Sequence, residues 1–464
     1  MSRPIKLLVC LAISLAIWIL PVPNGITSQA WHLLAIFAGT IAGFILQPLP
    51  IGAVAILACV LSVILGVLKG SQALEGFSSS LIWLIVAAFM FAAGFIKTGL
   101  GARIAYHLLH RFGSSTLAVS YVLTATDLIA SPFTPSNTAR GGGIVFPIAQ
   151  SICSTLGCVP GGKNSRTGAF LMYVCYSAAL TSACIFMTAS STNVASTQFA
   201  KDLWGIDISW MLWFAAASVP GLLITVITPP VLRFLIKPEL NAIPEIRREA
   251  ADKIQALGPM SHSEKALCLI FAIALLLWCT SDLHGIEAAW VALLGLSAML
   301  LTRVLSWEDI LEQRGAWDVL IWMGIMLNFA SYLSKLGLMD WVAKQSVNLM
   351  PGASWLILFA ILAVIYNYIH YGLASTTAHI LALFTAFGSV VIAAGAPVLP
   401  VVIIFSALAS SSAFLTHFGC GVTPIFFGAG YLSQSQWRKV GLILATMQLV
   451  IWVGIGLPWM MLID

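Results

Sequence analysis

The stretch Ser131-Pro-Phe-Thr-Pro-Ser-Asn-Thr-Ala-Arg-Gly-Gly-Gly143 is polar, cationic and rich in turn-forming residues, inside a chain that is otherwise almost continuously apolar. Pro132 and Pro135 prevent a regular helix from running through it. Non-helical backbone survives at membrane depth only where protein covers it or water reaches it. The stretch therefore predicts a binding site built around a helix break.

A second stretch, Ala374-Ser-Thr-Thr-Ala-His379, repeats the first one 239 residues later, so that Ser375 corresponds to Ser136 and His379 to Arg140. Two further landmarks precede each stretch in the same order: Leu81-Ile-Trp83 and Lys97-Thr-Gly-Leu100 in the first half, Leu320-Ile-Trp322 and Lys335-Leu-Gly-Leu338 in the second. The matched series indicates an internal duplication.

The composition is that of an integral membrane protein of the helical class. Of 464 residues, 60% are hydrophobic and only 8% are charged, with a mean hydropathy of +0.98. So few charged residues cannot cover a soluble core, and a net charge of +5, scattered between apolar spans, does not indicate a nucleic-acid partner. The nine cysteines have no metal-ligand spacing, so we expect no metal site and no cofactor.

We expect about eleven transmembrane helices and two re-entrant hairpins in an all-α polytopic fold. The hairpins are 116–153 and 355–394. A charged segment, 238–259, is expected to form an interfacial helix that links two halves. The expected spans are 7–20, 31–46, 51–67, 81–109, 168–199 (broken at 188–193), 210–235, 266–280, 288–301, 319–349, 401–428 (broken around 416–424) and one at the C-terminus.

Basic residues predict the orientation of these spans. With a cytoplasmic N-terminus, sixteen Lys and Arg residues fall inside and four outside, as the positive-inside rule requires. The two hairpins then enter from opposite sides, which is the mark of an inverted repeat and predicts a secondary transporter with its substrate at mid-membrane. No transit segment rich in Ser and Arg precedes the first span, so we expect a cell inner (plasma) membrane location.

The hairpin tips and broken helices bring helix ends toward one region, where N-terminal ends attract carboxylates. The tips add hydroxyl and amide donors. The expected substrate-binding residues are Ser136, Asn137, Thr138, Ser375, Thr376, Thr377, Arg140 and His379, with Thr192, Asn193, His417 and Asp127 as secondary candidates.

Arg140 stays charged and is costly in a bilayer, so it needs a partner or a purpose. Two hypotheses remain open: a structural pair with Asp127, or a side chain that faces the cavity and selects anions. His379, at the matching position, adds a second positive charge when it is protonated.

The tips, the duplicated hairpins and the broken spans resemble the divalent anion/sodium symporter family over essentially the whole chain. The run from Thr134 to Gly143 is most similar to the branch of 2-oxoglutarate/malate and citrate exchangers. The resemblance implies a homodimer and an elevator mechanism, with the tip Asn and Thr residues on the substrate carboxylates. Sodium-coupled members have Asn in both tips and no cation two residues beyond them, whereas this chain has Thr376, Arg140 and His379.

The implied domains follow the repeat. They are N-terminal scaffold helices (1–115), a first hairpin and broken helix (116–236), the linker (237–265), further scaffold helices (266–350), and a second hairpin and broken helix (351–464).

These features favour sodium-independent exchange of di- or tricarboxylates such as 2-oxoglutarate, malate or succinate. A fixed cation cannot leave an empty carrier, and moving unpaired charge is expensive. The alternatives are a sodium- or proton-coupled symporter and, from another class, an anion channel. No motif indicates an enzyme or catalytic residues.

Overall fold

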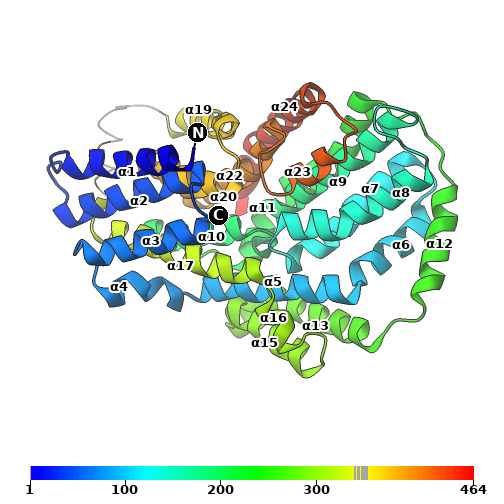
Figure 1. Cartoon of the computed structure of the whole chain (residues 1–464), viewed down its shortest axis with the longest axis horizontal. Helices are drawn as coiled ribbons and strands as arrows, with labels where there is room; N and C mark the ends of the chain where they lie inside the picture. The colour runs from blue at the N-terminus through cyan, green and yellow to red at the C-terminus, as the bar shows by residue number, and fades with distance from the viewer. Residues whose placement is uncertain (1, 339–340, 342–344, 346–353, 464) are drawn as a thin grey trace.

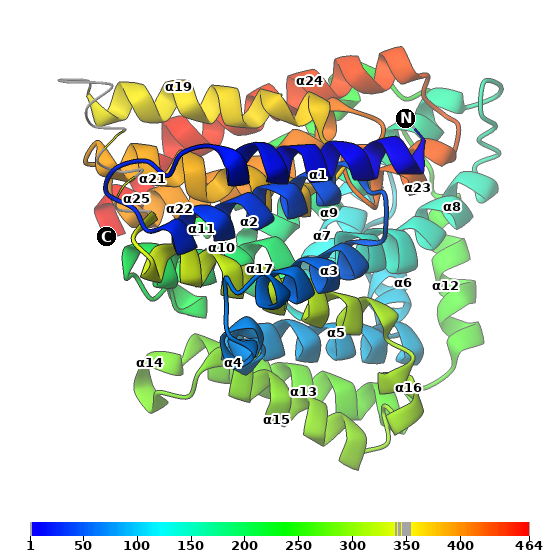
Figure 2. The same ribbon diagram turned by 60° about the vertical axis from the view of Figure 1, so that its left-hand side comes forward.

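The computed structural model describes residues 2–338, 341, 345 and 354–463. Every named element in these ranges is a helix, and eleven helices are long and apolar enough to cross a membrane. Most helices lie roughly along one direction in Figure 2, with the N-terminus at one end of the bundle and the C-terminus at the other.

The first half contains a helix–turn–helix hairpin and a broken helix. Its helices are α1 (Arg3–Ile19), α2 (Ser28–Leu46), α3 (Ile51–Ile64), α4 (Gly70–Leu74), η1 (Glu75–Ser78), α5 (Ser80–Thr98), α6 (Leu100–Phe112), α7 (Thr116–Ala130), η2 (Ser131–Phe133), η3 (Thr138–Val145), α8 (Phe146–Thr155), α9 (Ser165–Ile185), η4 (Met187–Ala189), α10 (Ser191–Trp204) and α11 (Trp210–Ile236).

The second half follows the linker helix α12 (Glu245–Leu257) and contains the second hairpin and break. Its helices are α13 (His262–Cys279), α14 (Ser281–His284), α15 (Ala288–Leu301), α16 (Trp307–Leu311), α17 (Arg314–Lys335), α19 (Trp355–Tyr368), η5 (Ile369–Gly372), α20 (Thr376–His379), η6 (Ile380–Phe384), α21 (Thr385–Ala393), α22 (Val398–Ser411), η7 (Ser412–Leu415), α23 (Thr423–Gly428), α24 (Gln434–Ile451), η8 (Trp452–Gly456) and α25 (Leu457–Ile463).

Both predicted hairpins and both predicted breaks are present. The first hairpin joins α7 to η3 and α8 through a turn at the tip, and the second joins α19 to α20 and α21 in the same way. The break after α9 lies at 186–190 and the break after α22 at 416–422, close to the expected positions. Hydroxyl-rich sequence marks both tips and the first break, whereas the second break, 416–424, contains Gly419, Gly421 and Pro424.

The expected span 81–109 is wrong as a single helix. It divides at Gly99, whose φ of +72° is the left-handed conformation that ends many helices. The eleven spans also differ in identity: hairpin arms 116–133, 355–372 and 376–393 are long enough, whereas α1, α3 and α15 have only 17, 14 and 14 residues. The end of the expected span 319–349 lies outside the described residues.

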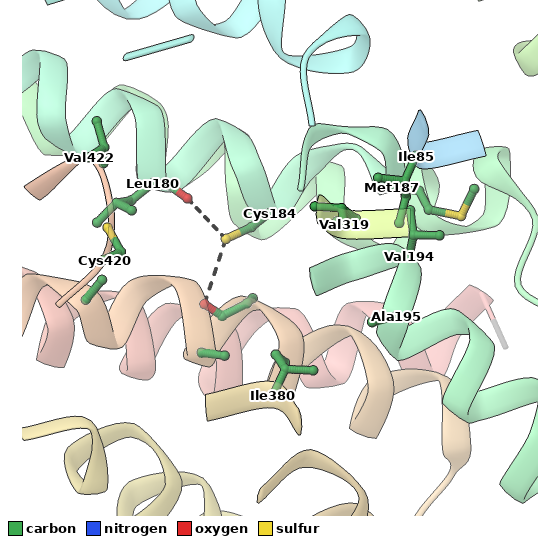
Figure 3. Packing of buried hydrophobic residues seen from close by; sticks show 14 of the residues in the cluster. Ile85, Leu180, Cys184, Met187, Val194, Ala195, Val319, Ile380, Cys420 and Val422 are labelled. Atoms are coloured by element: carbon green, nitrogen blue, oxygen red, sulfur yellow. Dashed lines mark hydrogen bonds between the residues drawn. The ribbon is translucent and has the colours of Figure 1, made fainter. Parts of the chain in front are cut away.

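The first segment of each broken helix, α9 in the first half and α22 in the second, lies at the centre of the molecule. All 21 residues of α9 except its first two are buried, and α22 is buried from Leu399 to Ser411. Figure 3 shows the side chains between them, where the Cys184 thiol on α9 points toward the carbonyl oxygen of Ala407 on α22. Helices buried on all sides are apolar all round, so hydropathy alone does not reveal which face carries function.

A buried ion pair anchors the linker helix α12, which lies along one edge of the molecule in Figure 1. Arg103 on α6 donates to both carboxylate oxygens of Glu264 on α13, at 2.6 and 3.2 Å, and to the carbonyl oxygen of Gly258 at 2.8 Å. Because Gly258 directly follows α12, this one guanidinium holds the C-terminal end of the linker helix against α6 and α13.

We predict that Glu264→Ala lowers the free energy of unfolding by about 3 kcal/mol, because it leaves Arg103 buried without its partner. The measurement is thermal unfolding of the detergent-solubilised protein. Asp207→Ala is the matched control: it removes the exposed Lys201–Asp207 pair and should cost less than about 1 kcal/mol. Equal losses in the two variants would contradict an anchoring role for Arg103.

Candidate functional site

The two tips and the two breaks meet at one cavity of about 220 Å³. All six tip residues expected to bind substrate line it, together with Thr192. Its remaining walls come from Phe89 on α5 and from Pro135, Ser190, Ser191, Cys420, Gly421 and Val422. Four helix ends that are far apart in sequence therefore face the same small polar space.

A serine caps the helix that begins at each tip. The Ser136 hydroxyl oxygen accepts a hydrogen bond from the backbone N–H of Ala139, and the Ser375 hydroxyl oxygen accepts one from Ala378, both at 3.2 Å. Ser190 caps α10 at the first break in a similar way. Each helix N-terminus carries roughly half a positive charge, so the backbone itself makes the cavity attractive to an anion.

The first tip packs directly on the second break. A Cβ added to Gly421 would lie 2.8 Å from the Thr138 hydroxyl oxygen, which is closer than such atoms approach. The tip is also bound to its own break, since the Ser191 N–H donates to the carbonyl oxygen of Pro135 at 3.2 Å. These contacts hold the cavity walls together.

Arg140 does not line the cavity. It is fully buried, and its Nε lies 3.0 Å from both carboxylate oxygens of Asp127. Of the two hypotheses for this residue, the structure contains the structural pair. The Ser182 hydroxyl donates to the same carboxylate, so both oxygens of Asp127 accept hydrogen bonds from buried groups.

The other nitrogens of Arg140 are satisfied by the backbone around the first break. They donate to the carbonyl oxygens of Thr134, Ala179 and Ala189 at 2.9, 2.8 and 3.3 Å, and to the Ser182 hydroxyl at 3.0 Å. A longer contact of 3.5 Å reaches the amide oxygen of Asn137 in the tip. Arg140 therefore joins the tip, the arm and the broken helix of the first half.

His379 is also buried outside the cavity, beside a histidine that the sequence analysis missed. Its Nδ1 lies 2.9 Å from Nδ1 of His370, whose Nε2 lies 2.8 Å from the carbonyl oxygen of Gly419. A lone histidine on the apolar arm before the tip gave no signal beyond its proximity to His379. Ser190 and Ser191 were not among the expected site residues either, although they belong to the hydroxyl-rich stretch 188–193 that predicted the first break.

The two buried clusters occupy equivalent positions. Ser182 and Ser412 are 230 residues apart, as are Ala189 and Gly419. Ser182 contacts Arg140, and the Ser412 hydroxyl lies 3.4 Å from Nδ1 of His379. The duplication thus extends from the tips to the polar contacts behind them.

Besides Asp127, two secondary candidates lie away from the cavity. Asn193 is buried and donates to the carbonyl oxygens of Ala183 and Phe186, at 2.7 and 3.0 Å, so it satisfies the carboxyl end of α9. His417 is half-buried, and its Nδ1 lies 3.3 Å from the side-chain nitrogen of Gln434.

Comparisons with known proteins agree on a family. The model of the sodium:sulfate symporter transmembrane region matches residues 1–464. YflS of Bacillus subtilis, named as a malate transporter, is 42% identical over 98% of this chain and 95% of its own length. Spinach chloroplastic dicarboxylate transporter 1 is 39% identical over 98% and 80%. The YdaH transporter of Alcanivorax borkumensis has the same fold, with a TM-score of 0.60 at 15% identity, covering 88% and 89%.

We predict that Asp127→Ala and Arg140→Ala each destabilise the protein by about 3–5 kcal/mol, because each leaves one buried charge without its partner. The double variant Asp127→Leu/Arg140→Met should recover part of that loss. Thermal unfolding checks both statements.

The opposite pattern would show that Arg140 serves the anion directly. In that case Arg140→Ala would remain stable and lose anion binding, while Asp127→Ala would keep both stability and binding. Both readouts come from the same purified samples, with malate as the probe.

Proposed function

The chain belongs to the sodium:sulfate symporter family, and on this premise we propose that it exchanges small dicarboxylate anions across the membrane without sodium. The chain is a membrane transporter. The observation that carries the substrate class is the pair of matched tips facing one cavity, each with a capping serine and further hydroxyl or amide donors. The names of the relatives, malate and dicarboxylate transporters, point to the same class.

The charge of the cavity suits a dianion. Four helix N-termini at about half a charge each amount to about two positive charges, which two carboxylates balance. No Asp or Glu is among the residues that line the cavity. A volume of about 220 Å³ is below the range of drug-sized sites and fits a small metabolite.

The fixed positive charge that favours exchange comes from the backbone rather than from a cationic side chain. Arg140 is neutralised by Asp127, so it does not supply the fixed charge that the sequence suggested. The dipoles of the helices are fixed in the protein as well. An empty cavity therefore keeps a positive potential, and this potential opposes movement of the empty carrier through the apolar interior of the membrane. A bound dianion compensates this potential. We therefore expect the loaded carrier to move and the empty carrier to stay.

The wider arrangement follows from the same proposal. The hairpins and broken helices would move together as the transport domain of an elevator, against scaffold helices α1–α6 and α13–α17 of a homodimer. The protein would lie in the inner membrane with its N-terminus in the cytoplasm, as the distribution of basic residues favours.

We predict that vesicles preloaded with unlabelled malate take up labelled malate without sodium, and that empty vesicles take up almost none. The preloaded anion is needed because only the loaded carrier crosses. Initial rates in reconstituted vesicles, with C4 to C6 acids as competitors, provide the measurement. Uptake into empty vesicles that requires sodium would identify a symporter, and uptake that never saturates would identify a channel.

We predict that Asn137→Ala and Thr377→Ala each raise the KM for malate by about tenfold or more, because each removes a donor to a charged carboxylate. The expression level and unfolding temperature should not change. Ser297→Ala, an exposed serine on α15, is the matched control. Unchanged KM in both tip variants would contradict this site.

A further inference from the structure

Two adjoining cavities near the N-terminus share no lining residue with the site described above. The first is an apolar groove of about 490 Å³ lined by α1, α2 and α3, which lie together at one side of the molecule (Figure 1). Among the described residues that line this groove, none is charged. Its walls include Leu11 and Leu15 of α1 and Leu57 and Leu61 of α3, each between 38% and 53% exposed. In a membrane, leucines with this exposure contact acyl chains, which are equally apolar.

Two glycines of α2 form the floor of the groove. Helices α1 and α3 each pack on α2, close to its backbone. A Cβ added to Gly39 would collide with the Ser14 hydroxyl of α1, and one added to Gly43 would lie 2.7 Å from a methyl group of Val54 on α3. The longer side chains of α1 and α3 therefore rise on either side of a low glycine surface, and the groove is the space between them.

The groove has the length of one leaflet of a bilayer. Its α1 wall extends from Leu7 to Trp18, which is roughly 16 Å along a helix. The hydrocarbon core of a bilayer is about 30 Å thick, so one leaflet contributes about half of that. A single acyl chain lying along the groove would therefore fill it from end to end.

The second cavity is polar, has a volume of about 540 Å³ and adjoins one end of the groove. Leu65, which follows α3, lines both spaces. The indole of Trp18 in the groove stacks on the His32 ring in the polar cavity, with 3.9 Å between the ring centroids. The first turn of α2, the turn after α3 and the start of α4 provide the rest of the wall, including Lys69 and Gln72. An apolar space thus continues into a polar one.

The polar cavity lies where lipid headgroups are expected. Trp18 stacks on His32 and Trp31 directly precedes it, and tryptophan collects at the interface between membrane and water. Lys69 is exposed, and no Asp or Glu is among the described residues that line the cavity. No ion pair in the described part of the chain includes Lys69. Its ammonium group is therefore available to a phosphate.

We propose that the groove and the polar cavity together bind one anionic phospholipid, with an acyl chain in the groove and the phosphate beside Lys69. The side-chain oxygen of Gln72 accepts from the backbone N–H of Lys69 at 2.8 Å, which leaves the amide nitrogen of Gln72 to donate to the phosphate. A choline or ethanolamine group would bring a second cation close to Lys69 without a carboxylate to balance it. A lipid with net negative charge is therefore preferred, and this preference does not depend on which anion the protein transports.

The test adds phosphatidylglycerol or phosphatidylcholine, with identical acyl chains, to the delipidated protein in detergent and counts the bound lipids by native mass spectrometry. We expect one tightly bound phosphatidylglycerol per chain. Its affinity should exceed that of phosphatidylcholine by about fivefold, the effect of one lysine close to an anionic lipid. The unfolding temperature of the natural chain should also rise more with phosphatidylglycerol than with phosphatidylcholine.

Two variants test the two ends of the site separately. Lys69→Gln should remove the preference for phosphatidylglycerol, whereas Lys163→Gln, the same change at another exposed lysine, should keep it. Leu61→Trp places an indole in the groove and should weaken the binding of both lipids. Its matched control is Ile64→Trp, because Ile64 is 74% exposed on the same helix and does not line the groove.

The natural chain alone decides the question if a variant fails to fold. Equal affinity for the two lipids would overturn the proposal, because the polar cavity would then not recognise the headgroup. Stabilisation by inorganic phosphate as strong as that by phosphatidylglycerol would overturn it in favour of a site for free anions. A lipid-free dimer that dissociates in Leu61→Trp but not in Ile64→Trp would assign the groove to a second copy of the chain instead.

Discussion

The buried contact between Asp127 and Arg140 makes the first half of the site possible. A broken helix leaves carbonyl groups without partners, and no water in the bilayer core replaces them. Arg140 donates to the carbonyl oxygens of Ala179 on α9, Ala189 in the first break and Thr134 beside the tip, while Asp127 balances its charge. One guanidinium therefore donates hydrogen bonds to the irregular backbone that forms the cavity.

The second half meets the same requirement with different chemistry. At the second break the carbonyl oxygen of Gly419 is met by His370, and the serine equivalent to Ser182 contacts His379. The duplicated architecture thus holds a compensated ion pair behind one tip and two hydrogen-bonded histidines behind the other.

Residue patterns predicted the tips and breaks well because these depend on local chemistry. Proline and runs of Ser and Thr interrupt helices through local interactions that do not depend on the tertiary fold. Capping serines likewise accept a hydrogen bond from the backbone of the next helical turn. The division of the expected span 81–109 was missed although Lys97, Thr98 and Gly101 surround Gly99, because apolar residues continue on both sides of this short polar segment. The orientation of the Arg140 side chain was left open. The residue type shows that a buried cation needs a partner, but it does not show which of several possible partners the side chain contacts.

The sequence by itself determined a polytopic helical protein with two matched hairpins, two broken helices and the donors at their tips, because hydropathy and helix-breaking residues act over a few turns. Only the tertiary structure decided that Arg140 and His379 lie behind the cavity and that Ser190, Ser191 and Gly421 lie in its wall. It also brought His370 to Gly419. These contacts join segments tens to hundreds of residues apart, and their geometry depends on how whole helices pack.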